Sequence, residues 1–552
     1  MRQHRRNCFL LWAMFGMLAL LVMPSRADET TDPAIESIIA QMSLRQQVAQ
    51  MFVATFYGNP LNEPSRDFLQ TYQPGMVALL PSNLGNPQQV AQLSNDMQAA
   101  ITQAGGIPLF VAVDQEGGII AHLEDGFTRW PVPMLLTATQ NPELAYKVGE
   151  AYAEEMRAVG LNMNLAPVAD LYTNPDNPII GRRSFGARAE QVTPIVTAFA
   201  QGMQSGGVLA VAKHFPGHGD TSADSHVTLP VVDYDAARLH QVEMAPFVGL
   251  AQGGVGAIMT AHIWYPALEP ESLVPASLSE RVVTGVLRDE MAYQGLIMTD
   301  AMDMDAIDIN HSPQEAALMA VMAGNDLILT GAHVSLEFQA QAIEGVIAAV
   351  EAGEIEAARI TSSVRRILQA KQQMGVLDWA PVDVYMADEA VNLAAHAEVV
   401  TAMFEEGIAV AYGADQLPLQ QNALLIYPAS QPSLWRACAQ YAPYQPMGYS
   451  DTPSADESAW ARGAAAGASQ VVIFTRNLAE NAPLLELVNG LPPEKTIVVA
   501  MHAPEDWQVI PEVRGYVMTY SPLFAAYEPL CAILSGALPA KGQVVIDMAI
   551  SP

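Results

Sequence analysis

Residues 208–230 read VLAVAKHFPGHGDTSADSHVTLP and join an apolar run to a loop rich in ionisable side chains. The run is apolar up to Lys213 and His214, which is typical of a strand buried on both faces in a parallel sheet. The loop that follows contains two glycines around one histidine, and then Asp224 and His226. The segment therefore predicts a parallel strand whose carboxyl end carries chemistry.

Seven similar apolar runs occur between about residue 45 and residue 375. Stretches with helical periodicity, such as TPIVTAFAQGMQSGG, lie between most of them and end in glycine, as helices often do. Strands that each precede a helix predict an α/β protein with a (β/α)8 barrel of the TIM type. An open doubly wound sheet is the alternative, but eight strands in one unit favour the barrel. The candidate strands are MFVATF (51–56), MVALL (76–80), LFVAVD (109–114), NMNLAPV (162–168), VLAVAKH (208–214), AIMTAH (257–262), LIMTD (296–300) and DLILT (326–330).

A second unit follows the barrel. Its candidate strands are NALLIYPA, SQVVIFTRN, KTIVVAMHA and RGYVMTYS, and helical stretches separate them. We predict the barrel over residues 28–375, a linker over 376–389, and a smaller three-layer α/β sandwich over 390–552. No G-x-G-x-x-G motif follows a strand in this unit, so a dinucleotide cofactor is not expected.

The composition excludes several classes of protein. Hydrophobic residues make up 51% of the 552 residues and charged residues 15%, which argues against wholesale disorder. The formal net charge of −32 repels nucleic acid and anionic membranes, since phosphate binding depends on clustered Lys and Arg. The expected partner is therefore a small molecule, or a polymer bound in small pieces. The sequence does not indicate an oligomeric state.

Residues 1–27 have the pattern of a secretory signal. Basic residues precede an apolar run from Cys8 to Met23, and small residues lie before a cleavage position after Ala27. An uncleaved membrane anchor is the alternative, but the run is short for a spanning helix, which needs about 20 residues. We therefore expect an exported protein, extracellular or associated with the cell envelope, and not held in the membrane after cleavage. In an oxidising compartment Cys438 and Cys531 could form a disulfide.

Five of the predicted barrel strands end at ionisable residues. In a (β/α)8 barrel the active site lies at the carboxyl ends of the strands, so these side chains are candidate functional residues. Asp300 closes its strand and has the position expected of a nucleophile or a charge stabiliser. Asp303, Asp305 and Asp308 lie beyond that strand end, where acidic residues at helix starts are common. The candidates are Asp114, Asp170, Lys213 with His214, His262 and Asp300.

Asp224 and His226 form a candidate acid/base pair in the loop. They are two residues apart, so in an extended segment their side chains lie on the same face. An aspartate bonded to an imidazole orients it and raises its basicity, which suits general acid/base catalysis. A metallohydrolase that uses the loop histidines is a different possibility, but the chain lacks the H-x-H pair typical of such barrels. We expect no metal and no cofactor.

The loop motif K-H-F-P-G-H-G-D-T-x-x-D-S-H-x-x-L-P resembles the signature of bacterial β-N-acetylglucosaminidases of glycoside hydrolase family 3. The resemblance covers about residues 35–375, and the C-terminal unit also resembles the family's second domain. Further matching segments are VDQEGG (113–118), NLAPVAD (164–170), IIGRRSFG (179–186), IMTAHI (258–263) and LIMTDAMDM (296–304).

The resemblance implies a role for each matching residue. Asp300 is expected to be the nucleophile of a retaining mechanism, His226 the acid/base and Asp224 its partner. The residues expected to hold the terminal sugar are Asp114, Arg183, Lys213 and His214. The family usually has R-V-x-R after DQEGG, whereas this chain has Ile119, Ile120, Ala121 and His122, so His122 is a further candidate for a sugar contact.

The implied activity is release of terminal β-linked N-acetylglucosamine, with peptidoglycan fragments as the expected substrates. A β-glucosidase or β-xylosidase of the same broad family is one alternative, although the intact Asp224/His226 pair argues against it. A phosphorylase is another, because a neutral imidazole does not repel phosphate as a carboxylate does. A carbohydrate-binding protein without activity is the non-enzymatic alternative.

Overall fold

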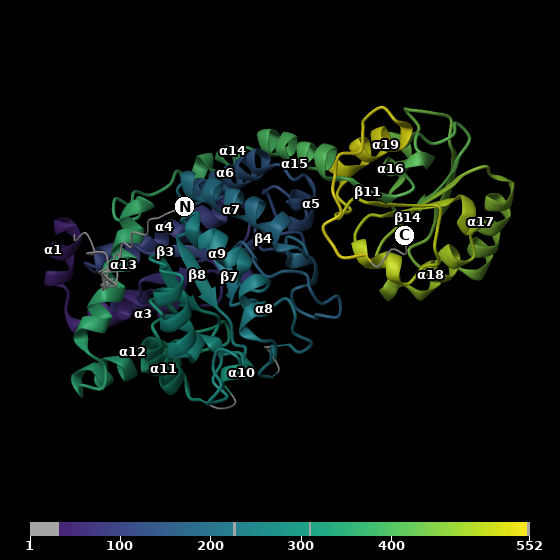
Figure 1. Ribbon diagram of the computed structural model, residues 1–552. Coiled ribbons are helices and arrows are strands. Elements are labelled where there is room, and N and C mark those ends of the chain that lie inside the picture. Colours follow the sequence, from purple (N-terminus) through teal and green to yellow (C-terminus); the bar gives the residue numbers. More distant parts are fainter. Residues whose placement is uncertain (1–31, 225–227, 309–310, 549–552) are drawn as a thin grey trace, which may run out of the picture.

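A computed structural model describes residues 32–224, 228–308 and 311–548. Figure 1 shows two lobes, and the larger one is built on a parallel sheet of eight strands in the order β10-β1-β2-β3-β6-β7-β8-β9. A parallel bridge between Met298 and Leu327 joins the two ends of this order, so the sheet forms a nearly closed barrel. The strands are β1 (Phe52–Ala54), β2 (Met76–Ala78), β3 (Phe110–Val113), β6 (Met163–Asn164), β7 (Leu209–Phe215), β8 (Ala257–Thr260), β9 (Leu296–Thr299) and β10 (Ile328–Leu329).

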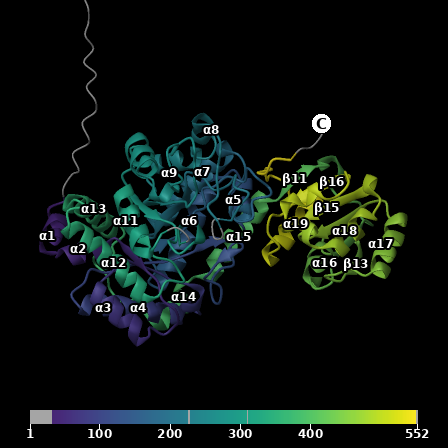
Figure 2. The ribbon, with the colours of Figure 1, turned by 90° about the horizontal axis from the view of Figure 1, so that it is seen from below.

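Helices surround the barrel, as the view from below in Figure 2 shows. Many are preceded by a residue whose side chain accepts a hydrogen bond from a backbone N–H of the first turn, such as Asn86 before α4 and Ser312 before α11. The helices of this lobe are α1 (Pro33–Gln41), α2 (Leu44–Gln50), α3 (Glu63–Tyr72), α4 (Pro87–Gln103), α5 (Pro133–Ala138), α6 (Pro142–Ala158), α7 (Ala189–Ser205), α8 (Ala236–Gln241), α9 (Ala245–Gln252), η4 (Arg281–Glu290), α10 (Asp305–Asp308), α11 (Pro313–Ala323), α12 (Leu336–Glu351) and α13 (Ala357–Gln373).

Seven of the eight barrel strands lie within the runs predicted from the sequence, and β7 extends one residue beyond its run, to Phe215. The predicted fold class is confirmed. Every residue of the eight strands is buried, because the barrel interior packs one face and the helices pack the other. The apolar runs therefore lack the alternation of a half-exposed strand. Adjacent strands are in parallel register; Val77 of β2, for example, is paired with Val111 of β3.

The smaller lobe is a second α/β domain around a six-stranded sheet in the order β11-β16-β15-β14-β12-β13. The helix pairs α16/α19 and α17/α18 lie on opposite faces of this sheet (Figure 1), which gives the expected three layers. The strands are β11 (Ala409–Tyr412), β12 (Leu424–Pro428), β13 (Gln445–Tyr449), β14 (Val471–Thr475), β15 (Thr496–Ala500) and β16 (Gly515–Met518). The helices are α16 (Pro432–Cys438), α17 (Ala455–Gly467), α18 (Ala482–Asn489) and α19 (Tyr527–Ser535).

The two edge strands of this sheet, β11 and β13, are absent from the sequence-based prediction. β13 reads QPMGY and is largely exposed, so it lacks the apolar signal of the central strands. Its proline is tolerated because an edge strand need not donate every backbone bond. β11 is short, and it pairs with β16 in the antiparallel direction. Cys438 and Cys531, which end α16 and lie within α19, form a disulfide.

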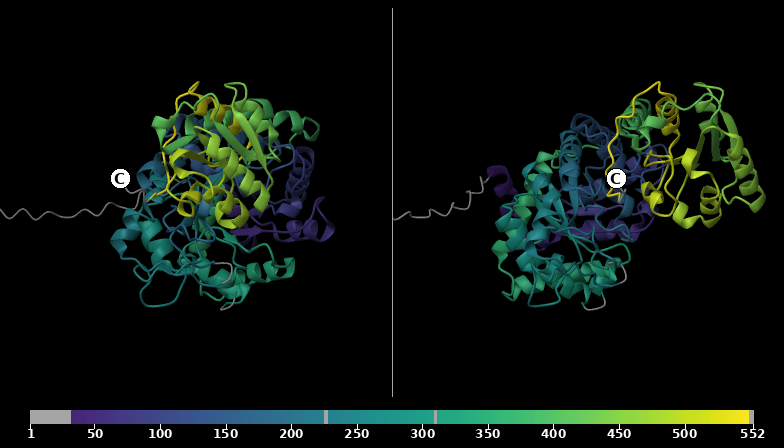
Figure 3. Two further views of the ribbon diagram at one scale, coloured as in Figure 1. Left: turned by 90° about the vertical axis from the view of Figure 1, so that its right-hand side faces the viewer. Right: turned by 45° about the vertical axis from the view of Figure 1, so that its right-hand side comes forward.

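The segment between the two sheets packs along the barrel. Val382 exchanges two hydrogen bonds with the Asn95 side chain on α4, and the segment continues as η5 (Val384–Met386) and α14 (Ala387–Ala390). α15 (Leu393–Gly407) then leads into β11. The chain end, yellow in Figure 3, returns to the junction, where Gln543 N–H donates to the Ala138 carbonyl at 2.8 Å. The domain boundaries given above stay predictions.

His396 on α15 anchors this helix to α6 of the barrel. Its Nδ1 lies 2.8 Å from Glu155 Oε1 and its Nε2 lies 3.1 Å from Glu154 Oε2. Burial opposes protonation of His396, but the two carboxylates outweigh burial and raise its pKa. The imidazolium therefore holds two carboxylates at the junction of the domains. Within the part of the chain that the structure describes, no helix is both long and apolar enough to cross a membrane.

Replacing this histidine, His396→Gln, is expected to lower the free energy of unfolding by about 2 kcal/mol, since hydrogen bonds to charged groups are lost. Because the pKa of His396 is higher in the folded state, its protonation stabilises the fold. This stabilisation is complete below the pKa of the unfolded state, about 6.5, and it is lost as the pH rises through the pKa of the folded state. The difference between wild type and variant should therefore be largest in mild acid. Denaturation from pH 5 to 9 checks this. His240→Gln, which removes an exposed pair with Glu290, is the matched control, and an equal loss there would contradict the prediction.

Candidate active site

A cavity of about 310 Å³ lies at the carboxyl ends of the barrel strands. The strand ends bring together side chains from β3, β7 and β9, although these are far apart in the sequence. Asp114 follows β3 directly, Lys213 and His214 lie within β7, and Asp300 follows β9. The ionisable residues that line the cavity are Asp114, Glu116, His122, Arg183, Lys213, His214, His218 and Asp300.

Four charged side chains of alternating sign form one wall. Lys213 Nζ lies 2.5 Å from Asp114 Oδ1 and 2.8 Å from Glu116 Oε1. Arg183 holds Glu116 with two bonds, from Nε at 2.8 Å and from Nη2 at 2.7 Å. Burial opposes ionisation of Glu116, but the charges of Lys213 and Arg183 outweigh it and lower the pKa to about 2. Glu116 is therefore held as a carboxylate, and the wall offers both donors and acceptors to a ligand.

Glu116 is positioned by a small hairpin, β4 (Gln115–Gly117) and β5 (Ile120–Ala121). The turn needs glycine, because Gly117 and Gly118 have φ values of +93° and +62°. A Cβ on Gly118 would also lie 2.4 Å from Val132 Cγ1. Glu116 lies in the VDQEGG motif but is absent from the site residues predicted from the sequence. The signal that could have found it is an acidic residue next to a glycine pair, just after a strand end.

Asp170 fixes the imidazole of His214 from behind the cavity wall. Its Oδ2 lies 2.7 Å from His214 Nδ1, and its carboxylate also accepts the backbone N–H groups of His214 and His218. Burial opposes ionisation of Asp170, but His214 and the other donors outweigh it and lower the pKa. Because the carboxylate accepts the Nδ1 proton, the Nε2 atom of His214 is left for a ligand.

Asp300 is a carboxylate held in its ionised form. Its Oδ1 accepts the Ala301 N–H at 2.7 Å. Burial opposes ionisation, but His214, His262 and the Ala301 amide outweigh burial and lower the pKa. His262 Nε2 donates to the Ala301 carbonyl at 2.9 Å, and its Nδ1 lies 2.7 Å from Ser277 Oγ. These two bonds fix the His262 ring. His262 does not line the cavity, and it holds the backbone that follows Asp300.

The remaining candidates differ in their placement. His122 lines the cavity, and its Nδ1 is buried without a hydrogen-bond partner among the described residues. Asp224 is described but is not among the residues that line the cavity. His226 lies outside the described residues, so the arrangement of the Asp224/His226 pair stays a prediction. Within residues 32–224, 228–308 and 311–548, no group of three or more His, Cys, Asp or Glu side chains is placed to hold a metal ion.

The second domain holds the segment that carries Arg183. The carbonyl of Val545 accepts the Ala187 N–H at 2.7 Å, and the carbonyl of Val544 accepts Arg188 Nη2 at 2.9 Å. Arg182, next to Arg183, lies near His502 of the second domain. Burial and the charges of Arg182 and Arg476 lower the pKa of His502 to about 4. The barrel segment around Arg183 therefore faces the second domain both at Arg182 and at Ala187 and Arg188. Sequence patterns do not report such long-range contacts.

Replacing Glu116 by glutamine is expected to lower the kcat/KM of this site by about 100-fold, since Lys213 and Arg183 lose their shared buried partner. A depressed pKa contributes stability above the unfolded value of about 4.5, and this is lost as the pH falls toward 2. The variant should therefore lose less stability than wild type on acidification. Kinetics and acid unfolding check both effects. Glu143→Gln, at an exposed pair with Lys147, is the control; the same fall there would contradict the assignment.

The chain is similar to known proteins of one family. Residues 43–370, more than half of the chain, match the model of the glycosyl hydrolase family 3 N-terminal domain. Beta-hexosaminidase A of Pseudoalteromonas piscicida is 32% identical over 380 residues, which cover 65% of this chain and 63% of that protein. Beta-hexosaminidase of Nitrosomonas eutropha is 34% identical over 278 residues, covering 49% of this chain and 78% of that protein.

The whole fold also has a counterpart among solved structures. The family 3 β-N-acetylglucosaminidase of Paenibacillus sp. str. FPU-7 superposes with a TM-score of 0.79 at 32% identity. The match covers 93% of this chain and 100% of that one, so both domains are included. The family model matches most of the barrel that carries the site, and this chain therefore belongs to glycosyl hydrolase family 3.

Proposed function

We propose that the protein is an exo-acting, retaining β-N-acetylhexosaminidase that releases terminal β-linked N-acetylglucosamine. The observation that carries this proposal is the ionised Asp300 in one cavity with the Asp114, Glu116, Arg183 and Lys213 wall. The names of the relatives support the choice of sugar. A cavity of about 310 Å³ is at the small end of ligand sites, which suits a single terminal sugar and exo action.

The proposed reaction has two steps. In the first, a carboxylate oxygen of Asp300 bonds to the anomeric carbon while the glycosidic bond breaks, and His226 gives its proton to the leaving oxygen. In the second, water gives a proton to His226 and its oxygen displaces Asp300 from the anomeric carbon. Two displacements retain the β configuration. Retaining enzymes usually use two carboxyl groups about 5–5.5 Å apart, and here an Asp224-supported histidine replaces the acid.

The sugar hydroxyls are proposed to bind the charged wall. Asp114 can accept from them, and Lys213 and Arg183 can donate to them. The Nε2 of His214 and the unpaired buried Nδ1 of His122 are two further groups for the ring substituents. A site that is built to hydrogen-bond a hydroxyl discriminates strongly against an analogue that lacks it, because its buried polar groups stay unpaired.

The protein is further proposed to be exported and to act on peptidoglycan fragments. The disulfide between Cys438 and Cys531 supports an oxidising compartment. The basic and apolar pattern of residues 1–27 supports a cleaved signal. Sequencing the amino terminus of the protein secreted by a bacterial host tests this: a start at Asp28 supports export, and an intact leader on protein in the cytoplasm contradicts it.

The activity is tested with the nitrophenyl glycosides of β-N-acetylglucosamine and β-glucose, side by side and with EDTA present. We expect rapid nitrophenol release from the acetamido sugar, little from the glucoside, and free N-acetylglucosamine as the product. Preference for the glucoside would overturn the choice of sugar. Formation of a sugar phosphate in phosphate buffer would replace hydrolysis by phosphorolysis. Loss of all turnover with EDTA would contradict the metal-independent mechanism.

A further inference from the structure

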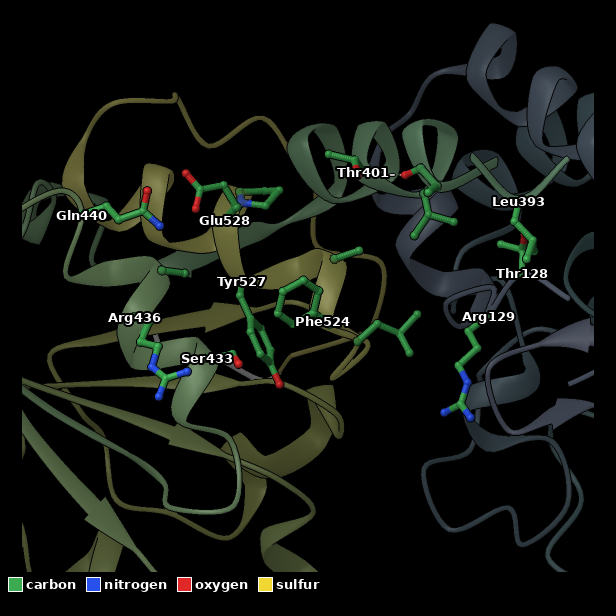
Figure 4. A pocket seen from close by; sticks show the side chains of 16 residues that line it. Thr128, Arg129, Leu393, Thr401, Ser433, Arg436, Gln440, Phe524, Tyr527 and Glu528 are labelled. Carbon is green, nitrogen blue, oxygen red and sulfur yellow. Dashed lines mark hydrogen bonds between the residues drawn. The ribbon is translucent and has the colours of Figure 1, made fainter. Parts of the chain in front are cut away.

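A second, larger cavity lies between the two domains, away from the catalytic residues. Its volume is about 760 Å³, within the range of small-molecule sites, which occur preferentially at domain interfaces. It shares no lining residue with the catalytic cavity. The barrel loop at Thr128 and Arg129 forms one side, α15 forms the roof, and α16 with the chain before and within α19 forms the other side (Figure 4).

The walls of this interdomain cavity are largely apolar. Leu393 and Val400 of α15 face Phe524 and Tyr527 of the second domain. The Phe524 side chain is 74% exposed and Leu393 is 42% exposed, both high for large apolar residues. Exposed apolar surface that gathers in a concave site is characteristic of ligand binding, since a ligand removes it from water. The expected ligand therefore has an apolar body.

Two arginines and one glutamate, Glu528, line the cavity, so its ionised side chains carry a net positive charge in a strongly acidic protein. Arg129 comes from the barrel and Arg436 from α16, and Figure 4 shows Phe524 and Tyr527 between them. Neither guanidinium has a hydrogen bond or ion pair with the described residues. The acidic lining residue, Glu528, already accepts the Tyr441 hydroxyl at 2.6 Å. With only 26 basic residues against 58 acidic ones in the chain, two unpaired arginines beside one apolar cavity point to an anionic group.

We propose that the interdomain cavity binds an anionic amphiphile: a molecule with an aliphatic or aromatic body and a carboxylate or similar acidic group. The body contacts Phe524, Tyr527 and the apolar face of α15. The acidic group pairs with one of the two guanidiniums, whose planar donors suit carboxylates, and the positive charge of the other attracts it from the far side of the aromatic rings. A fatty acid and the apolar carboxyl end of a peptide share this chemistry. This proposal does not depend on the glycosidase activity.

The probe for the first test is the fluorescent sulfonate 8-anilinonaphthalene-1-sulfonate, with uncharged N-phenyl-1-naphthylamine as its matched analogue. We expect saturable binding of the sulfonate at one site, weakened by high salt because the arginines are exposed. The uncharged analogue should bind more weakly and without salt dependence. Absence of saturable sulfonate binding to the full-length folded protein would overturn the proposal.

The variants assign the binding to this cavity. Arg436→Gln and Arg129→Gln are each expected to raise the Kd of the sulfonate about threefold, and together about tenfold, with no change for the uncharged probe. Phe524→Ala should weaken both probes by about tenfold. Arg462→Gln and Trp460→Ala on α17 are matched controls, since Trp460 is 75% exposed elsewhere on the second domain. If the control variants raise the Kd of the probes as much as the cavity variants do, the probes do not bind in the interdomain cavity.

Displacement identifies the class of ligand. Decanoate should displace the sulfonate probe better than decanol, and N-acetylphenylalanine better than its amide. If only decanoate displaces the probe, the ligand is a fatty acid. If only N-acetylphenylalanine displaces it, the ligand is the apolar carboxyl end of a peptide. Both outcomes support an anionic amphiphile. Equal displacement by the charged and uncharged members of both pairs would overturn the role of the arginines. Unchanged circular dichroism spectra and thermal unfolding of the variants show that they are folded.

Discussion

Replacing Asp300 by alanine is expected to lower kcat/KM for a nitrophenyl β-N-acetylglucosaminide by at least about 10⁴-fold, because loss of a nucleophile removes the covalent route. The carboxylate lies directly after β9, lines the catalytic cavity and is kept ionised by its surroundings. Steady-state kinetics measure the loss. The matched control is Asp305→Asn, which removes an exposed carboxylate at the start of α10 and should leave kcat/KM within about twofold of wild type.

Azide distinguishes a lost nucleophile from a damaged site. In the Asp300→Ala variant, azide can occupy the space left by the carboxylate and attack the anomeric carbon from that face. Partial recovery of nitrophenol release, with the α-glycosyl azide as product, is the expected result. A variant that keeps more than about a hundredth of the wild-type rate without azide would remove Asp300 from the role of nucleophile.

The His226→Ala variant is expected to lower kcat by about 10²- to 10⁴-fold on substrates with a poor leaving group, the usual contribution of general acid catalysis. A dinitrophenyl glycoside should be affected less in its first step, because its leaving group needs no proton. Comparison of the two substrates therefore measures the acid role. Azide should here give the β-glycosyl azide, since it attacks the glycosyl-enzyme after the first displacement.

Asp224→Asn completes this comparison. If Asp224 orients His226, the variant should resemble His226→Ala on the poor leaving group, with a smaller loss. Equal losses on both substrates in the His226→Ala variant would contradict acid catalysis and indicate a structural role for that loop. An α-glycosyl azide from the His226→Ala variant would reverse the assignment of acid and nucleophile.

The barrel could be predicted from the sequence because its strands are buried on both faces. The run LIMTD (296–300), for example, is apolar up to Met298 and buried up to Thr299, and it ends at Asp300, which lines the cavity. The edge strands β11 and β13 could not be predicted in the same way. β13 contains an exposed glutamine, a proline and a glycine, and only its pairing with β12 makes it a strand.

The candidate site also contains residues that could be predicted from the sequence and one that could not. Asp114, Lys213, His214 and Asp300 meet because parallel strands bring their carboxyl ends to one edge, which makes the prediction independent of the loops. Glu116 is different, since its position depends on a two-glycine turn and its charge on two partners from other parts of the chain.

The interdomain contacts could not be predicted at all. Val545 and Ala187 are hydrogen-bonded across more than half of the sequence, and His396 contacts Glu155 across 241 residues. Neither contact leaves a local pattern, because each depends on how the two folded domains pack together.

A covalent bond between Asp300 and the sugar is the step on which the proposed mechanism depends, and the mass of a trapped intermediate tests it. A fluorinated N-acetylglucosaminyl inactivator with a good leaving group forms the glycosyl-enzyme faster than water removes it. We expect the intact protein to gain one glycosyl unit and the modified peptide to carry it on Asp300. A glycosyl unit on another residue, or a protein that turns over the compound without any adduct and releases the α-anomer, would contradict the account.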